Sequence, residues 1–174
     1  LAGDAFLHDD GVDAPNRPML GDVGVAVFFP ESNGAIDPNQ ENWTESMWND
    51  VVSEITAGMA WWSTHAVNYG VQVTYMIQPL TWDDARQLVP VEPIVHPSSD
   101  QCLWIDPIMA AMGYAGSGCL GNVDDYNEDR LAAEGYDAFF SFFVVNSLND
   151  SDGKFTDGYF AYAYYGGPLS MMTY

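Results

Sequence analysis

The chain has 174 residues, of which 48% are hydrophobic and 14% aromatic, enough apolar surface to build the core of one globular domain. Its 25 carboxylates stand against four basic side chains, and the formal charge of -21 disfavours nucleic acids and anionic membrane surfaces as partners. No apolar run approaches the about 18 residues of a membrane span, so we expect no membrane insertion.

The first expected elements are an arm and a buried strand. Residues 1–20 are rich in Gly, Pro and Asp, which predicts an irregular amino-terminal arm. Residues 21–174 are expected to form a single domain. Within it, residues 23–29 form an almost continuous apolar run of strand length, which predicts a strand buried on both faces.

A long helix is expected next, because Thr44 can cap a first turn and apolar side chains then recur at helical spacing. The predicted core stripe consists of Trp48, Val51, Val52, Ile55, Met59 and Trp62. Residues 71–77 then alternate like a strand. A strand, a helix and a strand in this order predict a right-handed crossover and a parallel pair.

The middle of the chain contains both cysteines. Residues 79–100 are Pro-rich and predict a long surface connection, and two short helices are expected at residues 102–112 and 126–134. Cys102 and Cys119 have no zinc-ligand spacing around them. We therefore favour a disulfide between them, with two buried free thiols as the alternative.

The last third predicts the remaining strands. Residues 139–145 form a third buried strand, residues 159–164 an antiparallel edge strand and residues 169–174 a last apolar piece. The expected fold class is α/β (α+β): a mixed, mainly parallel sheet of about five strands with an antiparallel edge strand and helices packed on it. Because the chain stops on an apolar piece, we expect an incomplete domain or an edge that another polypeptide completes.

Oxygen ligands gather in the polar loop before the edge strand. Asn149, Asp150 and Asp152 precede Gly153, and Asp157 lies four residues beyond it, a spacing that suits a hard cation such as calcium. Alignment of Gly153 with the fixed glycine of an EF-hand places apolar or aromatic residues at the first and last ligand positions, which excludes an EF-hand. A hydrated turn without metal is the alternative.

Asn42 and Asn149 each begin an N-glycosylation sequon. Together with the cysteine pair, these sequons favour a secreted or cell-surface protein.

Catalytic motifs are absent from the sequence. His8, His65 and His96 form neither HExxH nor HxH, and there is no GxSxG elbow. We therefore assign no catalytic residue to this chain.

The run FFVVNSLNDSDGKFTDGYFAYAY, residues 142–164, followed by Gly166-Gly167-Pro168 and Met172-Thr173-Tyr174, resembles a family of secreted bacterial and archaeal zincin-like zinc metallopeptidases. Agreement extends to residues 25–29, 42–44, 61–62 and 104–114. The resemblance thus covers residues 21–174.

This resemblance implies that the chain is the amino-terminal portion of a zincin-like domain and ends before the helix that carries HExxH. In that motif the two histidines bind zinc and the glutamate is the general base. Zinc is therefore expected only if the chain continues into that helix. The resemblance also implies that the edge strand, with Tyr159, Phe160, Ala161 and Tyr162, positions a peptide or protein segment by strand addition.

Two functions follow from these observations. The first is a secreted metallopeptidase-like domain that lacks its zinc-binding helix. The alternative is a non-catalytic extracellular structural subunit of a filament or surface layer, in which copies of the chain pair through exposed edges.

Overall fold

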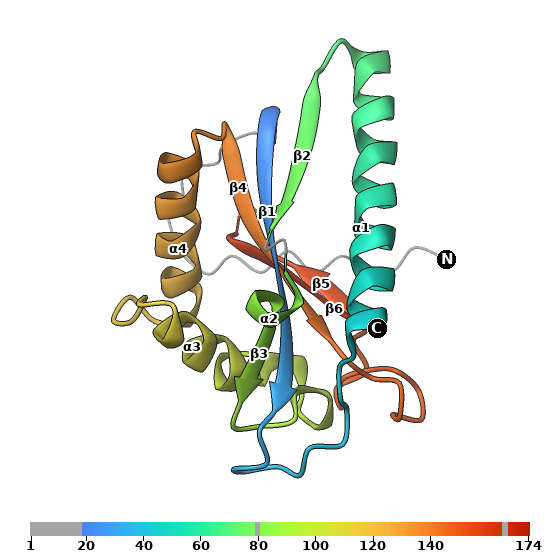
Figure 1. Ribbon diagram of the computed structural model, residues 1–174, viewed down its shortest axis with the longest axis vertical. Coiled ribbons are helices and arrows are strands. Elements are labelled where there is room, and N and C mark those ends of the chain that lie inside the picture. Colours follow the sequence, from blue (N-terminus) through green and yellow to red (C-terminus); the bar gives the residue numbers. More distant parts are fainter. Residues whose placement is uncertain (1–18, 79–80, 165–166) are drawn as a thin grey trace.

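A computed structural model describes residues 19–78, 81–164 and 167–174 of the chain. Most of the predicted arm, residues 1–20, lies outside these described residues. The described part is a mixed α/β structure in which helices cover both faces of one sheet (Figure 1).

The sheet has six strands in the order β2-β1-β4-β6-β5, with β3 paired to the far end of β1. They are β1 (Gly21–Ser32), β2 (Val73–Gln78), β3 (Arg86–Val89), β4 (Ala138–Val145), β5 (Ala161–Ala163) and β6 (Leu169–Thr173). All neighbours are parallel except β5 and β6, which are antiparallel. The prediction of a mainly parallel sheet with an antiparallel edge strand is therefore confirmed, with one strand more than expected.

Strand β1 forms the centre of the domain because its side chains are buried on both faces. Val23, Val25 and Val27 belong to the apolar cluster on one side of the sheet. Ala26 and Phe28 belong to the cluster on the other side, where Phe28 stacks on Phe143 of β4 with ring centroids 4.9 Å apart. The continuous apolar run predicted this double burial.

One long helix covers the first face. Helix α1 (Glu45–Ala66) begins where Thr44 Oγ1 accepts a hydrogen bond from Met47 N, as the capping pattern predicts. A 3₁₀ turn (Val67–Tyr69) and Gly70, in the left-handed conformation, end it. The connection from α1 to β2 projects beyond β1 and β4 in Figure 1. Trp62, predicted to lie in the core, is 60% exposed, so that part of the prediction is wrong.

Two helices, α3 (Cys102–Ala111) and α4 (Cys119–Glu134), cover the opposite face. A disulfide joins Cys102 to Cys119, with a Cα–Cα distance of 5.5 Å, which confirms the favoured pairing. Helix α4 begins well before the predicted residue 126, because Gly118 ends the preceding loop with a positive φ of 79°. No helix among the described residues is both long and apolar enough to cross a membrane.

The segment predicted as a surface connection, residues 79–100, contains regular structure instead. Helix α2 (Trp82–Ala85) is followed by β3 and by two 3₁₀ turns, Pro93–Val95 and Ser98–Asp100. Val89, Val91 and Ile94 are almost completely buried. Sequence reasoning missed β3 because four residues are too few to show a period.

Candidate functional site

Strand β5, the free edge of the sheet next to β6, is the first part of the candidate site. Strand β5 consists of residues 161–163, which are shorter than the predicted 159–164, so Tyr159 and Phe160 lie in the preceding loop. Phe160 still accepts a hydrogen bond through its carbonyl oxygen from Thr173 N at 2.8 Å. Because bonded positions alternate along an antiparallel ladder, Ala161 and Ala163 direct their N–H and C=O groups to the free edge.

The edge strand is held from behind by Tyr162. Its hydroxyl oxygen lies 2.8 Å from Gln101 Oε1 and 3.3 Å from the carbonyl oxygen of Ser98. Gln101 Nε2 in turn donates to the hydroxyl of Tyr164. Burial, followed by the nearby Tyr164 and Asp157, strongly raises the pKa of Tyr162, so this phenol stays neutral and can donate. These hydrogen bonds hold β5 in place, and with it the backbone groups that it directs to the free edge.

The polar loop before β5 is fastened to the 3₁₀ region beside it. Asp157 Oδ2 accepts hydrogen bonds from Ser98 N at 2.8 Å and Ser98 Oγ at 2.6 Å. Thr156 N donates to the carbonyl of His96 at 3.2 Å. Thr173 Oγ1 donates to the carbonyl of Gly153 at 2.7 Å, which closes the loop against β6.

The side chains of all four predicted calcium ligands make hydrogen bonds within the chain, and that of Asp152 accepts through Oδ1 from Lys154 N at 3.2 Å. Asp150 Oδ1 accepts from Asp152 N and Gly153 N, and the bond from Asp152 N is the largest influence that lowers the pKa of Asp150. Asn149 bonds to Gln40 and Glu41, and Asp157 bonds to Ser98. In the described ranges no group of at least three His, Cys, Asp or Glu side chains could hold a metal ion. Calcium binding at this loop stays a prediction.

Three glutamates that the sequence did not single out are buried together. Glu31, Glu41 and Glu92 are 4%, 2% and 1% exposed. Glu92 Oε2 accepts from Gln40 N at 2.9 Å and Glu41 N at 3.1 Å, while Glu31 Oε2 accepts from Trp43 N at 2.8 Å. Burial raises the pKa of Glu92 most, and the charges of Glu41 and Glu31 raise it further. These carboxylates act as caps for loop backbone.

A histidine and an aspartate close the same loop region. His96 Nε2 lies 2.7 Å from Asp37 Oδ2, which also accepts from Glu92 N at 3.1 Å. The hydrogen bond with His96 is the main influence that lowers the pKa of Asp37. His65 lies elsewhere, stacked on Trp61 with ring centroids 3.7 Å apart, and His8 falls outside the described residues. His65 in α1 and His96 after the 3₁₀ turn at Pro93–Val95 therefore lie in different parts of the fold.

Both glycosylation sequons lie on this loop region. Asn42 accepts a hydrogen bond through Oδ1 from Asn39 Nδ2 at 2.8 Å, so its own amide nitrogen, where a sugar attaches, is not used in that bond. Asn149 Nδ2 donates to the carbonyl of Gln40 at 2.9 Å and to Glu41 Oε2 at 3.1 Å. A glycan on Asn149 would disturb these bonds, which makes Asn42 the better acceptor.

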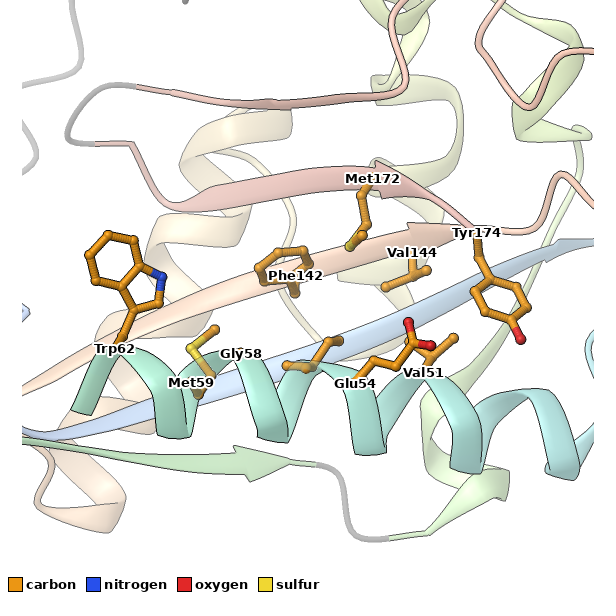
Figure 2. Close-up of a pocket in the computed structure, with 10 residues that line it drawn as sticks. Val51, Glu54, Gly58, Met59, Trp62, Phe142, Val144, Met172 and Tyr174 are labelled. Atoms are coloured by element: carbon orange, nitrogen blue, oxygen red, sulfur yellow. The ribbon is translucent and has the colours of Figure 1, made fainter. Parts of the chain in front are cut away.

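An apolar groove of about 380 Å³ lies between α1 and the strands β4 and β6 (Figure 2). Phe142 and Val144 from β4 and Met172 from β6 extend towards α1. The α1 wall of the groove is formed by Val51, Glu54, Ile55, Gly58, Met59 and Trp62. At Gly58 an added Cβ would meet no atom within 4 Å. The groove was not predicted, because it depends on which strands α1 leaves uncovered.

The chain matches no protein-family model, no curated protein and no solved structure. The resemblance to zincin-like metallopeptidases is therefore carried by the sequence runs alone. The geometry adds two features beside β6, an edge strand with outward backbone groups and an apolar groove.

Proposed function

We propose that this chain is the amino-terminal part of a secreted, zincin-like metallopeptidase domain, in which β5 positions an extended peptide substrate. A helix that follows β6 would pack in the groove between α1 and the strands β4 and β6. The single observation that carries the proposal is this groove, because it is apolar, long enough to follow α1 and adjacent to the last strand.

The groove suits an amphipathic helix. Its walls are formed by aliphatic, aromatic and methionine side chains, and Glu54 is the charged residue among those that line it. A helix with an apolar stripe would bury Phe142, Val144 and Met172. A helix seated there would bring its side chains towards the edge of the sheet where β6 and β5 lie.

Substrate positioning by β5 is supported by its exposed backbone and its small side chains. Ala161 and Ala163 are exposed and leave room for the side chains of a paired strand. Main-chain hydrogen bonds to such an edge give affinity, and the flanking pockets give sequence preference. Tyr159 and Phe160, which are 44% and 64% exposed, lie where the paired peptide would leave the edge.

Zinc would come from the residues after β6 and not from this chain. The described residues contain no group of at least three His, Cys, Asp or Glu side chains that could hold a metal. In the proposed domain the HExxH helix supplies the metal chemistry of peptide hydrolysis. The residues of this chain bind and orient the peptide and exclude water from the groove.

Secretion or display on the cell surface is part of the same proposal. The disulfide between Cys102 and Cys119 supports it, because such bonds persist in oxidising compartments. The accessible sequon at Asn42 is compatible with that location.

The test is intact mass and carboxy-terminal sequencing of the native polypeptide, together with its zinc content and its hydrolysis of peptides. We expect HExxH in the segment that follows Tyr174, stoichiometric zinc and hydrolysis that a chelator abolishes. A native polypeptide with no zinc ligands and no hydrolysis refutes the peptidase. If that polypeptide still pairs with extended segments at β5, the function is instead that of a non-catalytic structural subunit.

A further inference from the structure

The second free edge of the sheet, at β2, has an unusual composition for this chain. Residues 55–82 contain no Asp, Glu, Lys or Arg, although the whole sequence carries 25 carboxylates and four basic side chains. This uncharged segment includes the second half of α1 and all of β2. Edge strands of soluble proteins are ordinarily protected by charged side chains or proline, and β2 has neither.

The same segment carries several exposed apolar side chains. Trp61, Val67 and Tyr69 are 51%, 64% and 84% exposed, and Met76 on β2 is 48% exposed. In Figure 1 the connection from α1 to β2, which includes Val67 and Tyr69, projects beyond β1 and β4.

The backbone of β2 shows which groups are free for pairing. Gly21 N donates to the carbonyl of Gln72 at 3.0 Å, so Gln72 faces β1. Orientation alternates along a strand, and Val73, Tyr75 and Ile77 therefore direct their N–H and C=O groups away from β1. Among the described strands β2 pairs with β1 alone.

We propose that two copies of this chain pair through β2, antiparallel about a twofold axis centred on Tyr75. In this register Tyr75 lies opposite its own copy, and Val73 lies opposite Ile77 of the second copy. Every residue with outward backbone groups thus meets another such residue, which satisfies both N–H and C=O of each. The two sheets become one continuous sheet.

A groove between α1 and β2 lies next to the proposed interface. It has a volume of about 370 Å³, and its α1 wall carries small or uncharged residues, Thr56, Ala60, Ser63 and Thr64. Tyr75 and Ile77 also line it, and hence they lie on the α1 face of β2. In the antiparallel pair, these two residues of the second copy fall on the same face beside the groove.

Charge favours this edge for contact between two copies of the chain. Over the acidic remainder of the surface two copies, each with a formal charge of -21, would repel each other. The uncharged segment is where two molecules of charge -21 meet with the least repulsion. Added salt screens the remaining repulsion, so it should tighten this dimer, whereas it would weaken an interface built on opposite charges.

The experiment is sedimentation velocity on the purified chain over a range of protein and salt concentrations. We expect a monomer–dimer equilibrium that shifts to dimer with salt. Tyr75→Pro removes the outward N–H at the centre of the interface and should raise the dimer dissociation constant by at least about tenfold, because proline is tolerated on an edge strand but cannot donate. Tyr75→Ala controls for the lost ring, and Ala163→Pro places the same change on the β5 edge and should leave the dimer intact.

Disulfide cross-linking tests the same register independently, in case the Tyr75→Pro variant does not fold. The two native cysteines are joined to each other, so Tyr75→Cys carries one free thiol. In the proposed register this thiol faces itself across the twofold axis at a separation of about 5.5 Å between Cα atoms, within disulfide range. Oxidation should give a covalent dimer, and Leu88→Cys on exposed β3 should not.

Three results overturn the proposal. A monomer at every protein and salt concentration means that β2 does not pair. An open-ended filament means that β2 pairs with a different edge. A dimer that Tyr75→Pro leaves unchanged, with no cross-link through Tyr75→Cys, means that another surface is used. Because β2 and β5 lie on opposite edges of the sheet, none of these results bears on the proposed peptidase.

Discussion

At the scale of single residues, the molecule fixes its loops with carboxylates and leaves backbone groups free on its edges. Glu31, Glu41 and Glu92 accept hydrogen bonds from loop N–H groups in place of basic partners, of which this chain has few. Ala161 and Ala163 do the opposite, since their backbone groups point to the free edge. Two predictions belong to this scale.

Replacement of Ala163 by proline should weaken peptide binding at β5. The variant removes one outward N–H without touching the bonds to β6, so we expect about tenfold weaker binding, the value of one lost hydrogen bond. Fluorescence anisotropy can measure it with a short labelled peptide of alternating Thr and Val that ends in lysines. Ala163→Ser keeps the N–H and should bind as the unmodified chain does. Equal binding by Ala163→Pro would show that the peptide does not pair with this edge.

Glu92→Gln should stabilise the protein at neutral pH. Burial raises the pKa of Glu92, so the stability that this group contributes is full at acidic pH and is lost as pH rises through its folded-state pKa. Glutamine stays neutral, and its oxygen can still accept from Gln40 N and Glu41 N. We expect a gain in unfolding free energy on the order of 1 kcal/mol at pH 7 that disappears on acidification. Urea unfolding across pH measures the difference, and a constant difference would contradict the assignment.

At the scale of elements, the periodicity of apolar residues predicted the long elements that pack against the sheet or lie at its centre. Strand β1, helix α1 and strand β4 came out of continuous apolar runs and a helical stripe. Strand β3 did not, because four residues carry no period and its partner β1 lies far away in sequence. The start of α4 was missed because its exposed face is acidic and the polar residues Asn122 and Asn127 interrupt its buried face.

The candidate site was less predictable than the fold. The edge strand was recognised, but its length was overestimated, since Tyr159 and Phe160 continue the aromatic alternation into a loop. The buried glutamates and the groove depend on contacts between distant segments, such as Asn149 N with Glu41 Oε1 at 2.8 Å. Local sequence gives no signal for contacts between residues so far apart in the chain. A glutamate next to a proline, as at Glu92-Pro93, is the nearest hint of a fixed loop carboxylate.

Removal of the disulfide belongs to the element scale, because it joins the first turns of α3 and α4. The bond spans a sequence separation of 17 residues. The double replacement Cys102→Ala and Cys119→Ala should lower the unfolding free energy by about 3 kcal/mol, mainly through the entropy of the unfolded chain. Urea unfolding of the variant beside the oxidised protein measures this loss. Ser117→Ala, in the same loop, should have a much smaller effect, and an equal effect would point to local packing in place of the cross-link.

At the scale of the whole molecule, net charge sets how stability responds to the solvent. A formal charge of -21 on a 174-residue chain makes the folded state repel itself. The uncharged segment at residues 55–82 concentrates the carboxylates on the rest of the surface and sharpens that repulsion.

Sodium chloride should therefore raise the thermal stability of the protein. Screening shortens the range of repulsion from about 30 Å at 0.01 M salt to about 8 Å at 0.15 M, so most of the gain should fall within this interval. Differential scanning calorimetry at constant pH and low protein concentration measures the shift in Tm. Potassium chloride should act as sodium chloride does. A Tm that falls with salt would mean that favourable ion pairs outweigh the excess of carboxylates.

The disulfide has a further consequence, because Cys102 is the neighbour of Gln101 in the chain. Gln101 holds the hydroxyl groups of both Tyr162 and Tyr164, the residues behind the β5 edge. The covalent clamp between α3 and α4 thus ends one peptide bond away from the anchor of that strand. Reduction of the disulfide should therefore loosen the support of β5 through Gln101, although neither cysteine belongs to that strand.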